Sequence, residues 1–158
     1  MFTDAQLAVM LFVSRVYFDE VKRVGMALDT AESHLAAVEA RLHPNGIDYA
    51  AIIGGGSLDM ADLIAEKAMD EDEVAAQIGH WRNVMAEAER VAGKVSDPMA
   101  SMALRFCYID GMREDDAARK MHVARATVQR LKRNGLILAY PHVPEEWKRF
   151  AIPPAVLP

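Results

Sequence analysis

The chain has 158 residues, of which 52% are hydrophobic and 26% are charged. This composition is ordinary for a soluble globular protein, and no apolar stretch approaches the ~20 residues that a membrane-spanning helix needs. The single cysteine, Cys107, has no partner for a disulfide and no metal-ligand neighbours at useful spacing, so we expect no metal and no cofactor. Together with the lack of a long apolar stretch, this favours a cytoplasmic protein without a membrane span.

The net charge of −5 is unevenly distributed along the chain. Residues 1–97 contain 8 Lys and Arg against 17 Asp and Glu, whereas residues 98–158 contain 10 against 6. Salt screens charges that lie more than about 10 Å apart, so the local charge decides whether a surface attracts nucleic acid. The basic excess in the last third of the chain is therefore compatible with DNA binding.

The first predicted helix begins after Thr3. Thr3 and Gln6 have the spacing of a capping box, in which each side chain satisfies the backbone N–H of the other residue. A seam of apolar or small residues then continues in steps of three and four, which favours a long helix packed against another helix. The Pro-Asn-Gly sequence at residues 44–46 is expected to end it. The members of the seam are Leu7, Met10, Ser14, Tyr17, Val21, Val24, Leu28, Ala31, Leu35, Val38 and Leu42.

The connector that follows has two features that resemble ligand sites. The glycines at residues 54–56 lack the Gly-Lys-Ser/Thr ending of a P-loop and are expected to form a hinge before a short helix over residues 58–67, which Ser57 would cap. The acidic run at residues 70–73 does not have the spacing of a calcium loop. It is predicted to form the first turn of the next helix, where the helix dipole favours acids.

The second long helix is predicted to run from the acidic run to about Val95. It carries a second heptad seam, and two such helices indicate either an antiparallel hairpin or arms that pair between subunits. Both arrangements remain open, and we expect a homodimer or a higher homo-oligomer. The members of this seam are Val74, Ile78, Trp81, Met85, Ala88, Ala92 and Val95.

Three short helices are predicted to follow the boundary at residues 96–98, where Ser96 or Asp97 can cap a helix and Pro98 suits its first position. They are expected to span residues 99–109, 113–121 and 125–134, and the third is expected to stop at Gly135. The residues predicted to face their common core are Met102, Leu104 or Phe106, Ile109, Ala117, Ala118, Met121, Val123, Val128 and Leu131.

A short helix, a tight turn that ends in an apolar residue, and a second helix form the pattern of a helix-turn-helix. The turn here would be His122-Val123, and the second helix, Arg125–Asn134, would enter the major groove. Arg can bind guanine and Gln can bind adenine through paired hydrogen bonds, while Arg or Lys neutralises phosphate. The predicted DNA-binding residues are Arg119, Arg125, Ala126, Thr127, Gln129, Arg130, Lys132 and Arg133.

These residues have different expected roles in the complex with double-stranded DNA. Gln129, Arg125 and Arg130 are expected to read bases. Lys132 and Arg133 are expected to hold phosphates. The chain carries no set of nucleophile, base and orienting residue, so we expect no enzymatic activity.

The sequence here resembles a known family. The run LRFCYIDGM at residues 104–112, the pair Ala117-Ala118 and the run TVQR at residues 127–130 are similar to a sigma-factor region-4 helix-turn-helix. The likeness is strongest to small phage and prophage regulators of the ArpU and RinA late-gene type, and it covers about 40 residues. The resemblance implies DNA binding and transcriptional control in a phage or prophage, with RNA polymerase as a further partner.

The chain departs from that family in its turn and beside its DNA face. His122 stands where the family usually has Gly, and His tolerates a left-handed conformation better than most other residues. Ala124 stands where the family has a Ser or Thr cap, which costs roughly 1 kcal/mol of helix stability. The acids at residues 114–116 would repel phosphate if they face the DNA.

Three other functions are compatible with the same pattern. A helix-turn-helix shape can be a purely structural core, in which Arg125, Arg130 and Arg133 pair with acids of the N-terminal arm. A small terminase subunit for DNA packaging would also bind DNA this way, commonly as a ring. A protein-interaction adaptor would bind a protein and no DNA.

The sequence thus predicts an all-α fold with three parts. Residues 1–95 form a helical hairpin or coiled-coil arm, and residues 98–140 form a trihelical helix-turn-helix domain. Residues 141–158 contain five prolines and form a tail, with a short turn around residues 144–150 and Trp147 as a docking residue.

Overall fold

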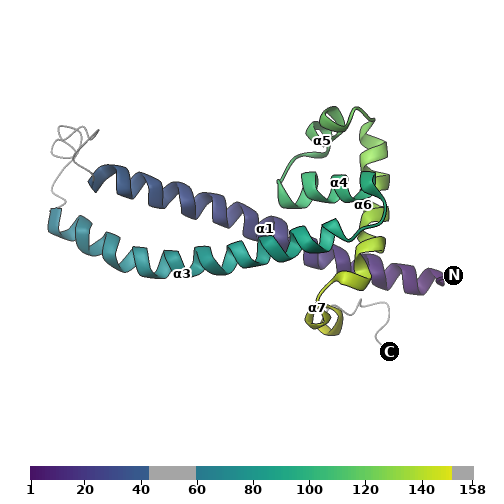
Figure 1. Ribbon diagram of the computed structural model, residues 1–158, viewed down its shortest axis with the longest axis horizontal. Coiled ribbons are helices and arrows are strands. Elements are labelled where there is room, and N and C mark those ends of the chain that lie inside the picture. Colours follow the sequence, from purple (N-terminus) through teal and green to yellow (C-terminus); the bar gives the residue numbers. More distant parts are fainter. Residues whose placement is uncertain (43–59, 151–158) are drawn as a thin grey trace. The chain divides into compact units, whose positions relative to one another are not determined.

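The computed structural model describes residues 1–42 and 60–150, and in these ranges the protein is all-α (Figure 1). No helix in the described ranges offers a stretch both long and apolar enough to span a bilayer. The elements are α1 (Asp4–Leu42), α3 (Met60–Gly93), α4 (Pro98–Leu104), the π-helical turn η1 (Arg105–Ile109), α5 (Glu114–Met121), α6 (Arg125–Ala139), the 3-10 turn η2 (Tyr140–His142) and α7 (Glu145–Phe150).

The chain divides into two compact units. The first contains Met1–Met26 and Val84–Pro158, and the second contains Ala27–Asn83. The division therefore crosses both long helices and does not fall at residue 95, where the sequence suggested a boundary. The start of α1 and the end of α3 belong to the same unit as the C-terminal helices, because they share one hydrophobic core with them.

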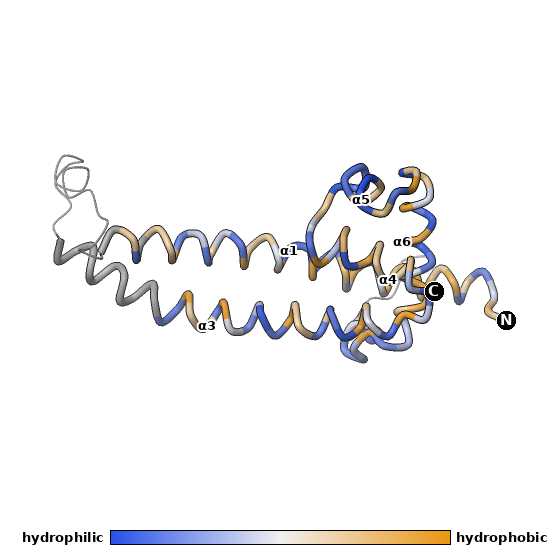
Figure 2. The backbone as a smooth tube through the Cα atoms, turned by 45° about the horizontal axis from the view of Figure 1, so that its top comes forward, coloured by the Kyte–Doolittle hydropathy of each residue, from blue (hydrophilic) through white to orange (hydrophobic). Residues whose placement is uncertain are grey.

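The capping box at the start of α1 is confirmed. The Thr3 backbone nitrogen donates a 2.9 Å hydrogen bond to Gln6 Oε1, and the Gln6 backbone nitrogen donates one of 3.2 Å to Thr3 Oγ1. Apolar residues recur along the helix (Figure 2), and the predicted seam is buried from Met10 to Val24, together with two residues outside the seam. The seam members Leu7, Leu28, Ala31 and Leu35 are only partly buried. The buried residues of α1 are Met10, Val13, Ser14, Tyr17, Phe18, Val21 and Val24.

Helix α1 contacts α3 of the same chain within each unit. In the first unit the Tyr17 hydroxyl donates a 3.1 Å hydrogen bond to Glu87, and Gly25 lies against the side chain of Met85. In the second unit Arg82 forms an ion pair of 2.7 Å with Glu32. The order of the contacts in the first unit means that the two helices run antiparallel there.

Helix α3 is continuous from Met60, so the expected break between a short helix and a second helix is wrong. Residues 60–78 contain no glycine or proline, and nothing in them interrupts the backbone hydrogen bonds. The acidic run at residues 70–73 consequently lies inside a helix and not in its first turn. The turn at residues 43–46, the glycine hinge and the Ser57 cap lie outside the described residues.

Helix α4 begins as expected. Asp97 accepts hydrogen bonds from the backbone nitrogens of Met99 and Ala100, and Pro98 occupies the first turn. The expected burial of Met102 is wrong, because the buried stripe of α4 follows Ala100, Ala103 and Leu104 and leaves Met102 39% exposed. In η1 the buried residues are Cys107 and Tyr108, and Phe106 and Ile109 are only partly buried.

Helix α6 continues to Ala139 and does not stop at Gly135, as the sequence suggested. Gly135 is buried where α6 packs against α4: a Cβ atom there would lie 2.8 Å from Leu104 Cγ and 3.0 Å from the Ala100 carbonyl oxygen. The glycine thus permits close packing of two helices, which a sequence pattern cannot distinguish from a helix stop.

The predicted turn after Tyr140 contains the helix α7. Its Trp147 ring packs edge-on against Tyr17, with 5.7 Å between ring centroids, in agreement with a docking role. Val143, just before α7, is buried in the core. Residues 151–158 lie outside the described part of the chain.

Candidate nucleic-acid interface

Helices α5 and α6 are joined by a tight left-handed turn. α5 ends at Met121, and His122 adopts φ 57° and ψ 42°, in the left-handed region. The Val123 backbone nitrogen donates to the Ala118 carbonyl, which closes the turn. Ala124 then starts α6 from an extended conformation without a side-chain cap. His122 therefore takes the left-handed conformation that usually favours glycine, at the position where the resembled family has Gly.

Helix α6 has one buried and one exposed face. Its buried residues include the predicted Val128 and Leu131, and α5 buries the predicted Ala117, Ala118 and Met121. Thr127 is partly buried, and the side chains on the opposite face are exposed. These exposed residues are Arg125, Ala126, Gln129, Arg130, Arg133 and Asn134.

One carboxylate binds three of the predicted DNA-binding residues. Glu114, the first residue of α5, accepts a 2.9 Å hydrogen bond from Gln129 and one of 3.0 Å from Lys132. Arg125 adds a longer contact of 3.3 Å to the same carboxylate and lies 3.7 Å from Asp115. The acids at the start of α5 thus contact the exposed face of α6.

The bound groups keep Glu114 ionised. The hydrogen bonds from Gln129 and Lys132 lower the pKa of Glu114 to about 2, against the opposing effect of partial burial, and Arg125 adds to the lowering. Lys132 is itself only 20% exposed, and its ammonium lies 5.1 Å from the centre of the Tyr108 ring. Lys132 therefore sits in a paired, half-enclosed position, unlike the free cation expected for a phosphate contact.

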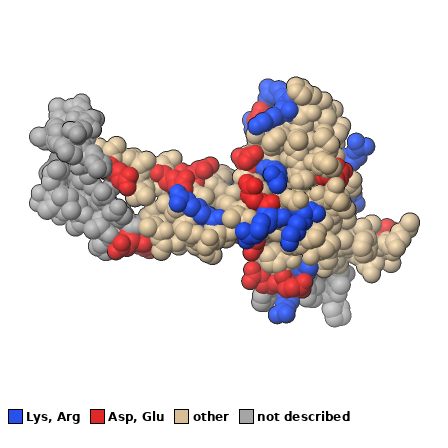
Figure 3. All heavy atoms as spheres, viewed as in Figure 1, with Lys and Arg blue, Asp and Glu red and all other residues tan. Residues whose placement is uncertain are grey.

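The remaining predicted residues differ in their pairing. Arg119 is exposed on α5 and forms an ion pair with Asp116, one turn earlier. Arg130 and Arg133 have no ion-pair partner among the described residues. No described residue of the N-terminal arm pairs with Arg125, whose partners lie in α5. On the face shown in Figure 3, basic side chains lie in separate groups with acidic ones between them.

A polar cleft of about 330 Å³ opens beside the exposed face of α6; we call it the α6 cleft. It contains Glu114 and its partners Gln129 and Lys132. It also contains residues from α1 and η1, which the sequence did not connect with the site. The lining residues are Arg15, Tyr108, Glu114, Gln129, Lys132, Arg133 and Leu136.

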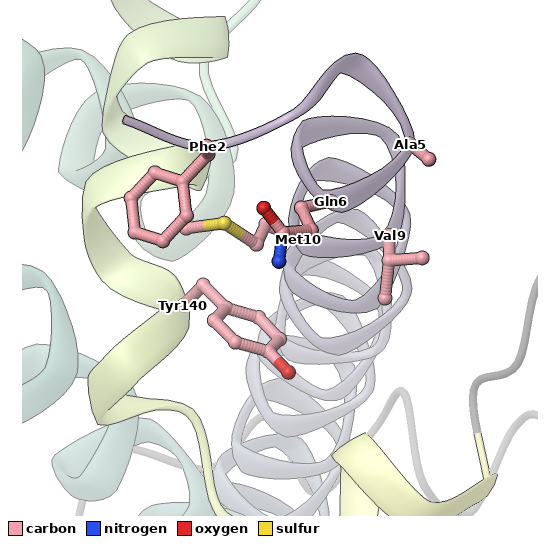
Figure 4. Close-up of a pocket in the computed structure, with 6 residues that line it drawn as sticks. All are labelled: Phe2, Ala5, Gln6, Val9, Met10 and Tyr140. Atoms are coloured by element: carbon pink, nitrogen blue, oxygen red, sulfur yellow. The ribbon is translucent and has the colours of Figure 1, made fainter.

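A second cavity, of about 400 Å³, lies at the start of α1 and is apolar (Figure 4). The rings of Phe2 and Tyr140 and the thioether of Met10 gather around it. Its lining contains no ionisable acid or base other than the phenol of Tyr140. It has the chemistry of a hydrophobic contact surface and not that of a catalytic site.

The sequence predicts which residues of α6 are exposed, but it does not predict their contacts with the acids of α5. The sequence predicts that the acids at residues 114–116 repel phosphate if they face the DNA. It does not predict the hydrogen bond between Gln129 and Glu114, which lie on two different helices. No local periodicity reveals such a contact. The sequence does not place Arg15 at this site, because Arg15 lies near the other end of the chain, on a helix predicted to belong to the arm.

Comparison with known proteins identifies no relative. No family model, no curated protein and no solved structure matches this chain.

Proposed function

We propose that this chain is a sequence-specific DNA-binding protein that inserts α6 into the major groove and regulates transcription in a phage or prophage. The observation that carries the proposal is the two-sided character of α6, directly after the left-handed turn at His122. Val128 and Leu131 anchor one side, while Gln129 and Arg130 are exposed on the other. An anchored helix that presents Arg and Gln suits the edges of bases in the major groove.

The sequence resemblance to region-4 helix-turn-helix regulators supports the same proposal. In this arrangement Gln129, Arg125 and Arg130 read bases, and Arg133 holds a phosphate. Lys132 has a supporting role instead, because it binds Glu114. A homodimer would present two such heads to paired half-sites on double-stranded DNA, and RNA polymerase would be the partner in transcription.

The competing candidate is a protein-interaction adaptor that binds no DNA. The observation that favours it is the carboxylate of Glu114, which binds one N–H of Gln129 and the ammonium of Lys132 and contacts Arg125. A DNA strand would have to share or replace these contacts. The two candidates differ in one measurable property, which is affinity for duplex DNA.

The proposal is tested by selecting duplexes from a random pool and measuring their binding across a salt series. The double variant Arg125→Ala/Arg130→Ala is compared with the wild-type chain. A matched control is Arg23→Ala, which removes an exposed arginine of α1 that is paired with Glu20. We expect binding to weaken steeply with salt, because phosphate contacts release counterions.

Three results distinguish the candidates. Loss of the selected sequences in the double variant, but not in the control, supports reading by α6. Absence of wild-type binding even near ~50 mM salt, where phosphate contacts are strong, refutes DNA binding and favours the adaptor. A particle of eight or more subunits that binds DNA would point to a packaging ring.

A further inference from the structure

The α6 cleft brings a residue of α1 next to the face of α6 that we propose reads DNA. Arg15 lines this cleft together with Gln129 and Arg133. All three residues belong to the first compact unit, which includes the start of α1. The protein surface beside the proposed recognition helix is thus built in part by the N-terminal helix.

Arg15 has a fixed place on α1 because its neighbours are anchored in the core. Tyr17 and Phe18 are buried, at 1% and 0% exposure, and the Phe18 ring packs against Tyr108 with 5.5 Å between centroids. Side chains leave a helix at fixed angles, so burial of these two residues sets the rotation of α1 about its axis. Arg15 is exposed and lines the cleft from this fixed backbone position.

The charges of the cleft favour an anion. Arg15, Lys132 and Arg133 are cationic, and Glu114 is the one carboxylate among the lining residues. The carboxylate of Glu114 is already balanced by Lys132, 3.0 Å away. Arg15 and Arg133 are exposed and have no ion-pair partner in the described part of the chain. Two guanidinium groups therefore remain to bind an anion at the cleft.

Asp19, an acid on α1, does not reverse the excess of positive charge at the α6 cleft. Burial raises the pKa of the Tyr108 hydroxyl on the cleft wall, the positive charges of Lys132 and Arg15 oppose the rise, and Asp19 adds to it. Asp19 thus acts on the same region as Arg15. With Lys132 paired to Glu114, the two guanidinium groups of Arg15 and Arg133 still outnumber this one acid.

We infer that Arg15 binds a backbone phosphate of the DNA whose major groove α6 enters, so that the DNA-binding surface includes α1. This inference rests on the proposed function. A guanidinium suits the task because it forms paired, charge-assisted hydrogen bonds to phosphate oxygens. Phosphate contacts of this kind fix the orientation of a protein on the duplex without reading its sequence. Arg15 would set the angle at which α6 lies in the groove.

The test measures the salt dependence of binding to a selected duplex by fluorescence anisotropy. Arg15→Ala should make the plot of log affinity against log salt concentration less steep by about 0.9, the value for one phosphate contact. The preferred sequence should stay the same. Arg15→Lys should restore the slope because an ammonium also neutralises a phosphate, and Arg15→Gln should behave like Arg15→Ala.

The matched control is Arg23→Ala, which removes an exposed arginine two turns further along α1 and outside the cleft. It should leave the slope unchanged. If the wild type binds its duplex and Arg15→Ala and Arg15→Gln keep the wild-type slope, the role of Arg15 is refuted while the proposed function stands. If the wild type binds no duplex at any salt concentration, the proposed function itself fails.

Discussion

The side-chain nitrogen of Gln129 lies 2.9 Å from the carboxylate of Glu114 and donates a hydrogen bond to it. An amide carries two N–H donors and one acceptor oxygen, so one N–H and the oxygen of Gln129 remain for other partners. These two groups match the acceptor and donor that adenine presents in the major groove. In the proposed complex Glu114 would orient Gln129 toward a base, and the charge of Glu114 also contributes to the stability of the free protein.

Glu114→Gln should destabilise the protein by about 1 to 2 kcal/mol at neutral pH, because it weakens charge-assisted hydrogen bonds to a partly exposed carboxylate. The pKa of Glu114 is about 2 in the folded protein, below its usual value, so the contribution is complete above about pH 4.5. It is lost as the pH falls toward 2. Urea unfolding of both proteins between pH 7 and pH 2.5 should show their difference shrink over this range.

The control for this measurement is Asp116→Asn, which removes the exposed ion pair with Arg119. It should cost at most about 0.5 kcal/mol. If the difference in unfolding free energy between wild type and Glu114→Gln stays constant with pH, the charge of the carboxylate does not contribute to stability.

Gly135→Ala should destabilise the protein by about 1 to 3 kcal/mol, although alanine is the better helix former. The new methyl would lie 2.8 Å from Leu104 Cγ and 3.0 Å from a backbone oxygen, so α4 and α6 would have to separate. The matched control is Gly79→Ala in α3, where nothing lies within 4 Å and the change should stabilise by up to ~1 kcal/mol. Equal effects of both changes in urea unfolding would contradict the close packing at Gly135.

His122→Gly should stabilise the protein by about 1 kcal/mol, since His122 has φ 57° and glycine adopts this conformation without strain. Gly111 offers the reciprocal test: it has φ 69° and no atom near its missing Cβ, so Gly111→Ala should cost about 1 kcal/mol through conformation alone. Thermal unfolding measures both. A lower midpoint for His122→Gly would mean that the imidazole makes a stabilising contact at the turn.

Ser14→Ala should stabilise the protein by about 1 kcal/mol. The Ser14 side chain is fully buried, and its hydroxyl oxygen has no hydrogen-bond partner among the described residues. An unsatisfied buried hydroxyl costs about 1 to 3 kcal/mol, which alanine removes while it keeps nearly the same volume. Urea unfolding checks the sign. A loss of stability would reveal a partner for the hydroxyl, such as one formed in an oligomer.

Features that depend on neighbours in sequence were predicted well. The Thr3 capping box, the cap of α4 by Asp97 (one of the two predicted candidates) and the buried Ala117-Ala118 pair all follow from residue type and short spacing. Each of these features is determined within one or two helical turns, where backbone hydrogen bonding and steric limits dominate.

Features that depend on contact between distant segments were missed. Gly135 looked like a helix stop because its role depends on Leu104 of another helix. Likewise, the place of Arg15 beside Gln129 depends on how α1 packs in the core. Periodicity predicts which face of a helix is buried but not the helix against which that face packs. The positions of Gly135 against Leu104 and of Arg15 beside Gln129 therefore could not be predicted from the sequence.

The shared core limits the positions at which this chain could recombine with another chain and still fold. Recombination at residue 98 would transfer α4 to α6 without the Phe18 ring that packs on Tyr108 or the buried Ala88 and Ala92 of α3. The transplanted segment would then expose apolar surface to water and lose its anchor. The compact unit is discontinuous in sequence, so a hybrid that keeps this core should carry residues 1–26 and 84–97 along with the C-terminal helices.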